Sequence, residues 1–344
     1  MNSGLELQAF RRKLLDWFDE NARDLPWRRS RDPYAIWVSE IMLQQTRVAA
    51  VLEHYARFME RFPQLNDLAA ASEEEVLAYW SGLGYYRRAR LLHKAAQFVA
   101  REMGGMLPQS AAELRTLPGV GDYTSAAIAS IGFGEPVACV DGNVERVLRR
   151  VKGWDEATGT QAKIRAEAAR LLDEKRAGDF NQAMMELGAT VCAPRSPQCA
   201  SCPLREICVT RGEHAVAARK KMRSKETMYA FLRRTSKARA TEVLLEQRPA
   251  GASLMPGMWE LPMIDAAHAY VTEENKALTL RHSITDTNYY VTIYKLDTKH
   301  QKNLPKRRAA REWFTTRELH SLPVTGLARK ALKRLRAWPG FESR

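Results

Sequence analysis

Apolar side chains recur at spacings of three and four residues through most of the first 190 positions of the chain. This spacing places apolar residues on one face of a helix, and turn-forming stretches such as GEP at 134–136 separate the runs. We therefore predict a nearly all-helical region. Its expected helices cover residues 5–20, 35–62, 86–103, 122–133, 143–151, 161–176 and 180–191.

The pattern changes after about residue 211. Residues 213–227 form a basic, weakly apolar run that is typical of an interdomain linker. Beyond it, β-branched and aromatic residues predict short strands, and an amphipathic helix closes the chain. The expected strands cover 228–234, 240–247 and 288–296, and the helix covers 325–338. The chain is thus predicted to hold a mainly α domain at 1–212 and a smaller α+β domain at 228–344.

The formal net charge is +14, and its distribution is uneven. Residues 1–210 hold 27 basic and 27 acidic side chains, whereas residues 211–344 hold 27 basic and 13 acidic ones. Such an excess indicates either a polyanionic partner such as nucleic acid or a basic, solvated surface. No run approaches the roughly 18 apolar residues of a membrane helix, and the first residues lack the apolar segment of a signal peptide. We therefore expect a cytoplasmic protein without a membrane partner.

Four of the five cysteines lie within 17 residues. Cys192, Cys199, Cys202 and Cys208 follow the spacing C-x6-C-x2-C-x5-C. Structural zinc usually takes two separated close pairs, whereas only the central two cysteines are close here. The spacing therefore favours a [4Fe–4S] cluster over zinc, and disulfides rank last in a cytoplasmic chain.

Two glycines at 119 and 121, in LPGVG, predict a tight turn before a helix. Exposed N–H groups of such a turn can hold a phosphate, although many Gly-x-Gly turns merely connect two elements. Twenty residues later, Asp141 and Asn143 precede another helical run, where capping is a sound role for both.

Glu40 lies in an apolar helical stretch, YAIWVSEIMLQQT. Cleavage of an N-glycosidic bond needs one carboxyl group to protonate the departing base and a second to face the developing cation. Burial would raise the pKa of Glu40 and keep its proton near neutral pH. The alternative is a glutamate on the wet face of an amphipathic helix.

The cysteine loop, placed after FNQAMMELG at 180–188, resembles that of helix-hairpin-helix DNA glycosylases related to endonuclease III. Arg195 and Arg205 beside the loop are either surface arginines or phosphate contacts. Further motifs resemble the adenine-specific, MutY-type branch of that superfamily: LPWR, SEIMLQQTR, GLGYYRRAR, LPGVGDYTSAA and VDGNVERV. The resemblance implies a monofunctional enzyme that flips out and hydrolytically removes adenine opposite 8-oxoguanine or guanine in double-stranded DNA, during base excision repair. We expect it to act as a monomer.

By this resemblance Glu40 protonates adenine and Asp141 stabilises the cationic sugar. Tyr123 and Asn143 would position Asp141 and the attacking water. Bifunctional relatives carry lysine at the position of Tyr123, and a phenol cannot form the imine through which a lysine cleaves the strand. No efficient lyase step is therefore expected. A buried aromatic with a satisfied hydroxyl is the plainer role for Tyr123.

The resemblance also assigns DNA contacts. Gln45 and Tyr85 match residues that wedge into the base stack, and Gly119 and Gly121 belong to the DNA-binding hairpin. An adenine pocket is implied for Arg28, Trp27 and Glu186, although Trp27 suits a packing role equally well. Tyr86 and Cys139 are expected in the core.

In the second domain, LMPGMWELP at 254–262 resembles a Nudix-like domain that recognises 8-oxoguanine, but the chain shows no full Nudix hydrolase motif. The lesion-reading loop would include Ser283 and Thr285. Relatives show Phe-Ser-His where this chain has Ile284, Thr285 and Asp286, so we expect weaker lesion discrimination.

Two other functions remain open from sequence. One is a thymine-mismatch glycosylase on the same scaffold, which the adenine-type motifs disfavour. The other is a non-catalytic iron–sulfur DNA-binding regulator, which the retained Glu40 and Asp141 disfavour.

Overall fold

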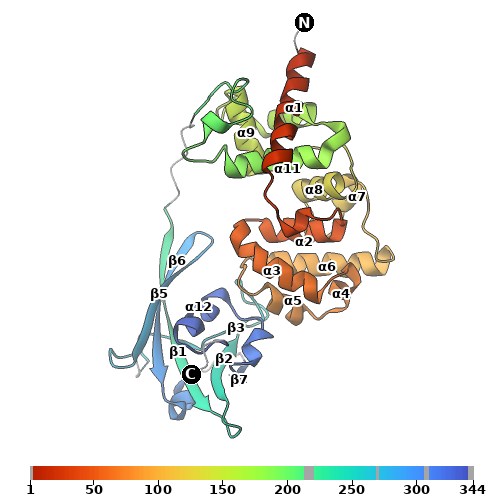
Figure 1. Ribbon diagram of the computed structural model, residues 1–344. Helices are drawn as coiled ribbons and strands as arrows, with labels where there is room; N and C mark the ends of the chain where they lie inside the picture. Colours follow the sequence, from red (N-terminus) through yellow and green to blue (C-terminus); the bar gives the residue numbers. More distant parts are fainter. Residues whose placement is uncertain (1–2, 213–220, 269–270, 306–309, 340–344) are drawn as a thin grey trace. The chain divides into compact units, whose positions relative to one another are not determined.

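A computed structural model of the chain describes residues 3–212, 221–268, 271–305 and 310–339 (Figure 1). The chain divides into two compact units. One consists of Met1–Ala70 and Leu91–Ala218, and the other of Ala71–Arg90 and Arg219–Arg344. Among the helices of these described stretches, none is both long and apolar enough to cross a membrane.

The first unit is helical, as the spacing of its apolar residues predicts (Figure 1). Its α-helices are α1 (Ser3–Asn21), α2 (Pro33–Leu43), α3 (Val48–Arg61), α4 (Leu65–Ala70), α7 (Ala111–Leu114), α8 (Asp122–Gly132), α9 (Gly142–Lys152), α10 (Gln161–Leu171) and α11 (Ala177–Thr190). Helix α6 (Arg87–Glu102) crosses the boundary between the units. Three short 3₁₀ turns cover Pro26–Arg28, Glu174–Arg176 and Cys199–Ser201.

Two predicted helices differ from the structure. The stretch 35–62 is two helices, because α2 ends at Leu43 and Gln45 adopts a left-handed backbone with φ 55°, which cannot continue a right-handed helix. The stretch 161–176 ends its α-helix at Leu171 and finishes in a 3₁₀ turn. The short helices α4 and α7 were not predicted, because neither is long enough to show a clear periodicity.

The hydrophobic core of the first unit is formed by helices from the beginning and the end of its sequence. Buried side chains of α1, α9, α10 and α11 pack together, among them Phe10, Leu148, Ile164 and Phe180. Gly178 lies against the backbone of Ser130 and Ile131, where an added Cβ would come within 2.7 Å of a carbonyl oxygen. This close approach brings α11 against α8, and both helices carry residues of the site described below.

The second unit is built on one mixed sheet. Its strands are β1 (Arg223–Thr235), β2 (Thr241–Gln247), β3 (Trp259–Glu260), β4 (Met263–Ile264), β5 (Lys276–Ile284), β6 (Thr287–Leu296) and β7 (Arg311–Thr315). The order is β3-β2-β1-β6-β5, with β4 paired to β1 and β7 to β2. Only the β1–β6 pair is parallel among these pairings.

Alternate residues of β1 enter two different cores, as strand geometry requires. Tyr229 and Phe231 join the cluster that includes α12 (Gly326–Arg334), whereas Ala230 and Leu232 join a second cluster. Short elements complete the unit: α5 (Glu73–Trp80) and the 3₁₀ turns Thr298–Asn303 and Glu318–His320.

The three predicted strands are confirmed in β1, β2 and β6, and the closing helix is confirmed in α12, which ends at Arg334 and not at residue 338 because Arg336 has a left-handed backbone. Strand β1 begins at Arg223, so residues 223–227 of the expected linker belong to the sheet, and residues 213–220 of that linker lie outside the described residues. The strands β3, β4, β5 and β7 were not predicted.

Candidate active site

Helix α2 carries Glu40 into the interior of the first unit. All residues from Tyr34 to Met42 are buried, so the helix has no solvent-facing side. The helix begins at a proline after Asp32, whose side chain accepts a hydrogen bond from the Tyr34 N–H. Glu40 is only 7% exposed, which rules out a place on a wet helix face.

The environment of Glu40 favours its protonated form. Burial raises the pKa of the Glu40 carboxyl from 4.5 to about 7, and the negative charge of Asp141 acts in the same direction. The Tyr123 hydroxyl and the charge of Arg28 oppose this shift without cancelling it. A substantial fraction of Glu40 therefore keeps its proton at neutral pH, as a general acid must.

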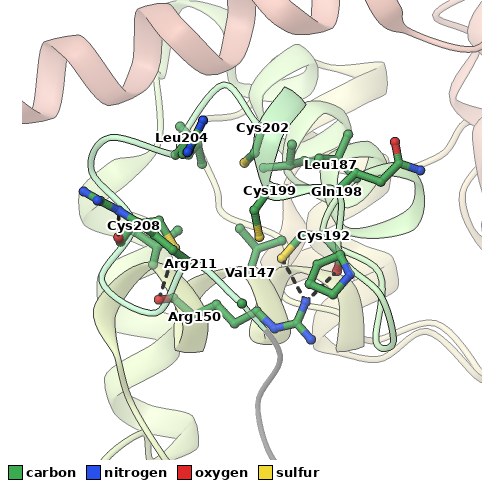
Figure 2. A pocket seen from close by; sticks show the side chains of 15 residues that line it. Val147, Arg150, Leu187, Cys192, Gln198, Cys199, Cys202, Leu204, Cys208 and Arg211 are labelled. Atoms are coloured by element: carbon green, nitrogen blue, oxygen red, sulfur yellow. Dashed lines mark hydrogen bonds between the residues drawn. The ribbon is translucent and has the colours of Figure 1, made fainter.

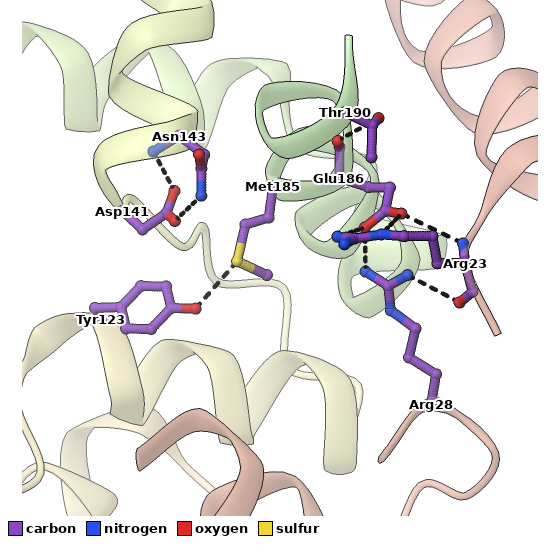
Figure 3. A network of polar contacts seen from close by, with 8 residues as sticks. All are labelled: Arg23, Arg28, Tyr123, Asp141, Asn143, Met185, Glu186 and Thr190. Carbon is purple, nitrogen blue, oxygen red and sulfur yellow. Dashed lines mark hydrogen bonds and ion pairs between the residues drawn. The ribbon is translucent and has the colours of Figure 1, made fainter. Parts of the chain in front are cut away.

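Tyr123 lies in the first turn of α8 and contacts Glu40 directly. Its hydroxyl donates a hydrogen bond of 2.6 Å to Glu40 Oε2, and the Met185 Sδ lies 3.1 Å from the Tyr123 hydroxyl oxygen. Figure 3 shows the Met185 side chain pointing toward this hydroxyl. Burial raises the pKa of Tyr123 well above its ordinary value, so the phenol keeps its proton. The Tyr123 hydroxyl thus bonds to Glu40, a contact that the sequence did not lead us to expect, and among the described residues only Asn143 donates a side-chain hydrogen bond to Asp141.

Asp141 caps the N-terminus of α9, and the cap fixes its side chain. Its Oδ1 accepts hydrogen bonds from the N–H groups of Asn143 and Val144, at 2.9 and 2.8 Å. Its Oδ2 accepts one of 2.7 Å from the Asn143 side-chain amide (Figure 3). Three N–H donors at the start of α9 thus hold the Asp141 side chain in place. Capping and a catalytic role are therefore compatible.

A chain of hydrogen bonds continues from Asn143 toward the cysteine loop. Arg146 Nη2 donates to Asn143 Oδ1 at 2.8 Å and to the Gly188 carbonyl at 2.7 Å, and its Nε donates to the Cys192 carbonyl at 2.9 Å. An added Cβ on Gly188 would lie 2.6 Å from the Asn143 Cβ, so only glycine lets α11 approach this close. Sequence reasoning missed Arg146, although a glycine inside the predicted helix 180–191 signalled a close approach.

Glu186 forms a buried ion-pair network. It is 1% exposed and accepts hydrogen bonds from Arg23 at 2.6 and 2.8 Å and from Arg28 Nη2 at 2.8 Å (Figure 3). Burial alone raises the pKa of Glu186, but the hydrogen bonds from the two arginines outweigh it and lower that pKa to about 2. Arg23 was not predicted, because nothing in its sequence context distinguishes it from a surface arginine.

Trp27 is buried and packs edge-on against Tyr55, with ring centroids 5.2 Å apart. This contact supports the packing role for Trp27. Tyr86 and Cys139 are buried, as expected for core residues.

The predicted hairpin ends at α8, and its first glycine is required by the backbone. Gly119 has a φ of 78°, and an added Cβ would lie 2.6 Å from the Leu91 Cβ. Gly121 has an extended backbone and open space where a Cβ would stand. As the cap residue of α8 it offers no side-chain hydrogen bond to the helix N–H groups.

Two residues predicted to contact DNA have left-handed backbones. Gln45, with φ 55°, is exposed between α2 and α3 in the first unit. Tyr85, with φ 48°, belongs to the second unit, is 45% exposed and has the Arg88 guanidinium 5.5 Å from its ring centroid. A left-handed bulky residue is strained, and such strain gathers at functional sites.

The β5–β6 turn holds the expected lesion-reading residues. Thr285, with φ 54°, and Asp286 form a two-residue connection between the paired Ile284 and Thr287. The Ser283 hydroxyl donates a hydrogen bond of 2.7 Å to Asn288 Oδ1. Asp286 lies 3.5 Å from the Arg223 guanidinium, an exposed pair that contributes little to stability.

All five cysteines are free, and four of them line one pocket (Figure 2). Cys192 follows α11, Cys199 begins a 3₁₀ turn, Cys202 ends that turn, and Cys208 follows it. Within the described residues, no three His, Cys, Asp or Glu side chains surround a point where a single metal ion could be held. Arg195 and Arg205 are exposed.

Arg150 brings a positive charge to the wall of this pocket. It is 3% exposed, and its Nη1 donates to the Ala193 carbonyl at 2.7 Å and lies 3.4 Å from the Cys192 Sγ (Figure 2). Its buried Nε has no hydrogen-bond partner among the described residues. A buried guanidinium beside thiols is costly unless negative charge compensates it.

A comparison with protein families matches residues 38–174 to the HhH-GPD superfamily of base excision DNA repair proteins. Among curated proteins, the chain is similar to the adenine DNA glycosylase of Homo sapiens, with 51% identity over 218 residues, which are 60% of this chain and 40% of that protein. It is also similar to that of Schizosaccharomyces pombe, with 33% identity over 324 residues, 76% of this chain and 70% of that protein. The chain therefore spans about two fifths of the length of the human relative.

Among solved structures, the chain is similar to a thermostable thymine-DNA glycosylase. The identity is 30% and the TM-score 0.57, over 61% of this chain and 99% of that one. The helical architecture of the first unit is thus that of a base excision repair glycosylase.

Proposed function

The chain belongs to the adenine DNA glycosylase family, and on this premise we propose that it hydrolytically excises adenine mispaired with 8-oxoguanine or guanine in double-stranded DNA. One observation carries the proposal. A buried Glu40 whose pKa is raised to about 7 is within electrostatic reach of the helix-capping Asp141. Paired carboxyl groups with different environments are the requirement for glycosidic cleavage.

Glu40 is the proposed acid. Adenine departs as an anion unless it is protonated, and the proton on Glu40 can be delivered as the sugar–base bond breaks. Tyr123 holds the Glu40 carboxyl in place through its 2.6 Å hydrogen bond. The buried surroundings exclude the water that would otherwise compete for this proton.

Asp141 is the proposed partner of the cationic sugar. Its three hydrogen bonds fix the orientation of the carboxylate without neutralising its negative charge. Asn143 belongs to this arrangement and is itself held by Arg146. Water then adds to the sugar and leaves an abasic site. Because residue 123 is a phenol and not an amine, no imine forms there and strand cleavage is not expected.

Adenine must leave the duplex to reach Glu40, which costs a few kcal/mol. Gln45 and Tyr85 are the residues that we propose to fill the gap, since both are exposed on left-handed backbone. The N–H groups at the start of α8, after Gly119 and Gly121, would hold a phosphate. Glu186, fully paired with Arg23 and Arg28, would orient Arg28 beside the adenine instead of contacting the base.

We infer that the four cysteines hold a [4Fe–4S] cluster. The donor set fits, because four thiols share one pocket, and among the described residues the buried Nε of Arg150, beside Cys192, has no hydrogen-bond partner. A thiolate-bound cluster would supply negative charge beside this guanidinium. The cluster would fold the loop and take no part in hydrolysis.

The second unit is the proposed lesion-recognition domain of Nudix-like type, with Ser283 and Thr285 in its reading loop. The Ser283 hydroxyl donates its hydrogen to Asn288, so Thr285 is the residue of this loop that we propose to hydrogen-bond to the lesion. We expect discrimination between 8-oxoguanine and guanine to be weak. Substituting Thr285 by Gly suits the left-handed turn and removes the hydroxyl, so an unchanged preference in that variant would contradict a role for this loop.

The activity is tested with duplexes that carry an adenine or a thymine mismatch, treated with alkali after incubation. We expect alkali-dependent breakage at adenine only, and its loss in Asp141→Asn. Asp173→Asn is the matched control, because Asp173 also caps a helical turn by accepting two backbone N–H bonds. Breakage at thymine would support the thymine-mismatch alternative, and no breakage anywhere would support a DNA-binding regulator.

A further inference from the structure

A basic hollow lies in the second unit, and the proposed excision of adenine does not use it. Its volume is about 580 Å³. The walls come from the end of β1, the β1–β2 turn, the end of β7 and the chain after α12. Four wall residues are arginines, namely Arg233, Arg239, Arg317 and Arg336, and Thr241, Thr315 and Thr316 add hydroxyl groups. Among the described residues, no Asp or Glu lines the hollow.

Two of these arginines occupy positions that ordinarily suit glycine. Arg239, with φ 61°, ends the β1–β2 turn, and its N–H donates to the Ser236 carbonyl. Arg336, with φ 52°, follows α12, and its N–H donates to the Lys333 carbonyl. The chain uses glycine at the corresponding end of α9, where Gly153 has φ 66°. Arginine at both strained positions, facing one hollow, indicates a role for the two side chains.

The hollow is remote from the expected lesion-reading loop. Strand β1 pairs in parallel with β6 from Arg223, opposite Thr287, to Leu232, opposite Leu296. The turn at Thr285 and Asp286 adjoins the first of these pairs, and the hollow adjoins the last. At about 3.3 Å per residue, the two lie roughly 30 Å apart along the sheet. The hollow is therefore not an extension of the lesion-reading loop.

We propose that this hollow binds phosphate groups. Guanidinium groups match phosphate oxygens with paired hydrogen bonds, and the hydroxyls of Thr241 and Thr316 can donate to the remaining oxygens, whereas the Thr315 hydroxyl donates to Glu318. A volume of about 580 Å³ is suited to a compact ligand such as a nucleotide or an oligophosphate. The same chemistry would hold phosphates of the DNA backbone, so the experiment distinguishes these two sources.

The test is calorimetric titration of the full chain with inorganic triphosphate. Arg239→Gly combined with Arg336→Gly removes two guanidinium groups and places glycine where the left-handed backbone suits it, so folding is preserved. We expect this double variant to bind triphosphate about 100-fold more weakly, about tenfold for each charge-assisted contact. Lys237→Ala is the matched control, because it removes a positive charge from the same turn without altering a wall residue. We expect it to change the affinity less than about twofold.

A second arm measures binding to undamaged duplex DNA over a range of salt. An unchanged salt slope in the double variant identifies a free phosphate compound as the source. A slope smaller by about 1.8, the value for two lost contacts, identifies the DNA backbone. The proposal is overturned if triphosphate does not bind the unaltered chain, or if the double variant binds it as tightly as Lys237→Ala does.

Discussion

The hydroxyl of Tyr123 donates its hydrogen bond to Glu40, whereas Asp141 is held by Asn143 and the start of α9. Each carboxyl group thus has its own supporting partners, although the charge of Asp141 reaches Glu40. One group is buried beside a phenol and retains its proton to about pH 7, and the other accepts three N–H bonds. Different surroundings for two neighbouring carboxyl groups assign them different tasks.

Tyr123→Phe should move the alkaline limb of the pH–rate profile upward. The Tyr123 hydrogen bond lowers the pKa of Glu40, so its removal lets Glu40 keep its proton to higher pH. The single-turnover rate of adenine excision, measured against pH, checks this. Tyr34→Phe, which removes a buried hydroxyl from the same helix as Glu40, should leave the limb in place. A downward shift in Tyr123→Phe would contradict the role given to this hydroxyl.

Glu40→Gln should be more stable than the unaltered chain at pH 8. Because the folded pKa of Glu40 is raised, the folded state binds more protons than the unfolded state between about pH 4.5 and 7, and stability falls as pH rises through that range. The raised pKa lowers the free energy of unfolding of the unaltered chain by about 3 kcal/mol at pH 8 and leaves it unchanged below pH 4. Urea unfolding at both pH values measures this difference. The exposed Glu53→Gln should show no such pH-dependent gain, and a gain in Glu40→Gln that is equal at both pH values would count against a raised pKa.

The burial of Glu40 and the helix-capping position of Asp141 could be predicted from the sequence, whereas their contacts with distant residues could not. Glu40, Asp141 and Asn143 were identifiable because a carboxyl in an apolar stretch and an Asp–Gly–Asn before a helix are local signals. The hydrogen bond from Tyr123 to Glu40 was not predicted, because it depends on how α8 packs against α2. Arg23, Arg146 and Arg150 were missed for a similar reason, because each has hydrogen-bond partners 40 or more positions away in the sequence.

The elements of the fold also differ in how far the sequence predicts them. Long amphipathic helices and the hydrophobic strands β1, β2 and β6 were predicted, since their periodicity is strong. The two-residue strands β3 and β4 form only by pairing with β2 and β1, respectively, so no local sequence pattern predicts them. Likewise, the break at Gln45 interrupts an apolar run that reads as one helix from sequence alone.

Glu186→Gln should destabilise the first unit by about 3 kcal/mol at pH 7, because it removes the negative charge shared by Arg23 and Arg28. The folded pKa of Glu186 is lowered to about 2, so its contribution is complete above about pH 4.5 and is lost as pH falls toward 2. Denaturant unfolding at pH 7 and at low pH measures both effects.

Glu206→Gln provides the contrast, because Glu206 is exposed and water screens its pair with Lys13, so we expect no measurable loss of stability. Equal losses in the two glutamate variants would show that the burial of Glu186 has no energetic consequence.

Cys199→Ala should lose bound iron, whereas Cys139→Ala should retain it. Cys199 lines the pocket shared by the four cysteines, and Cys139 is buried beside Ser130 in a different part of the first unit. Iron content and the visible absorption of the purified proteins measure the difference. A Cys199→Ala protein that keeps its full iron content would exclude a cluster at these four residues.

The single-turnover rate of adenine excision by Glu40→Gln tests the central claim most directly, because glutamine keeps the shape of the side chain and cannot deliver a proton. For the unaltered chain, the rate should fall about tenfold per pH unit above about pH 7, where Glu40 loses its proton. Glu40→Gln should be at least about 100-fold slower at pH 7 and insensitive to pH over the same range. A Glu40→Gln protein that excises adenine at the unaltered rate, with the same pH dependence, would contradict the claim that Glu40 protonates the departing base.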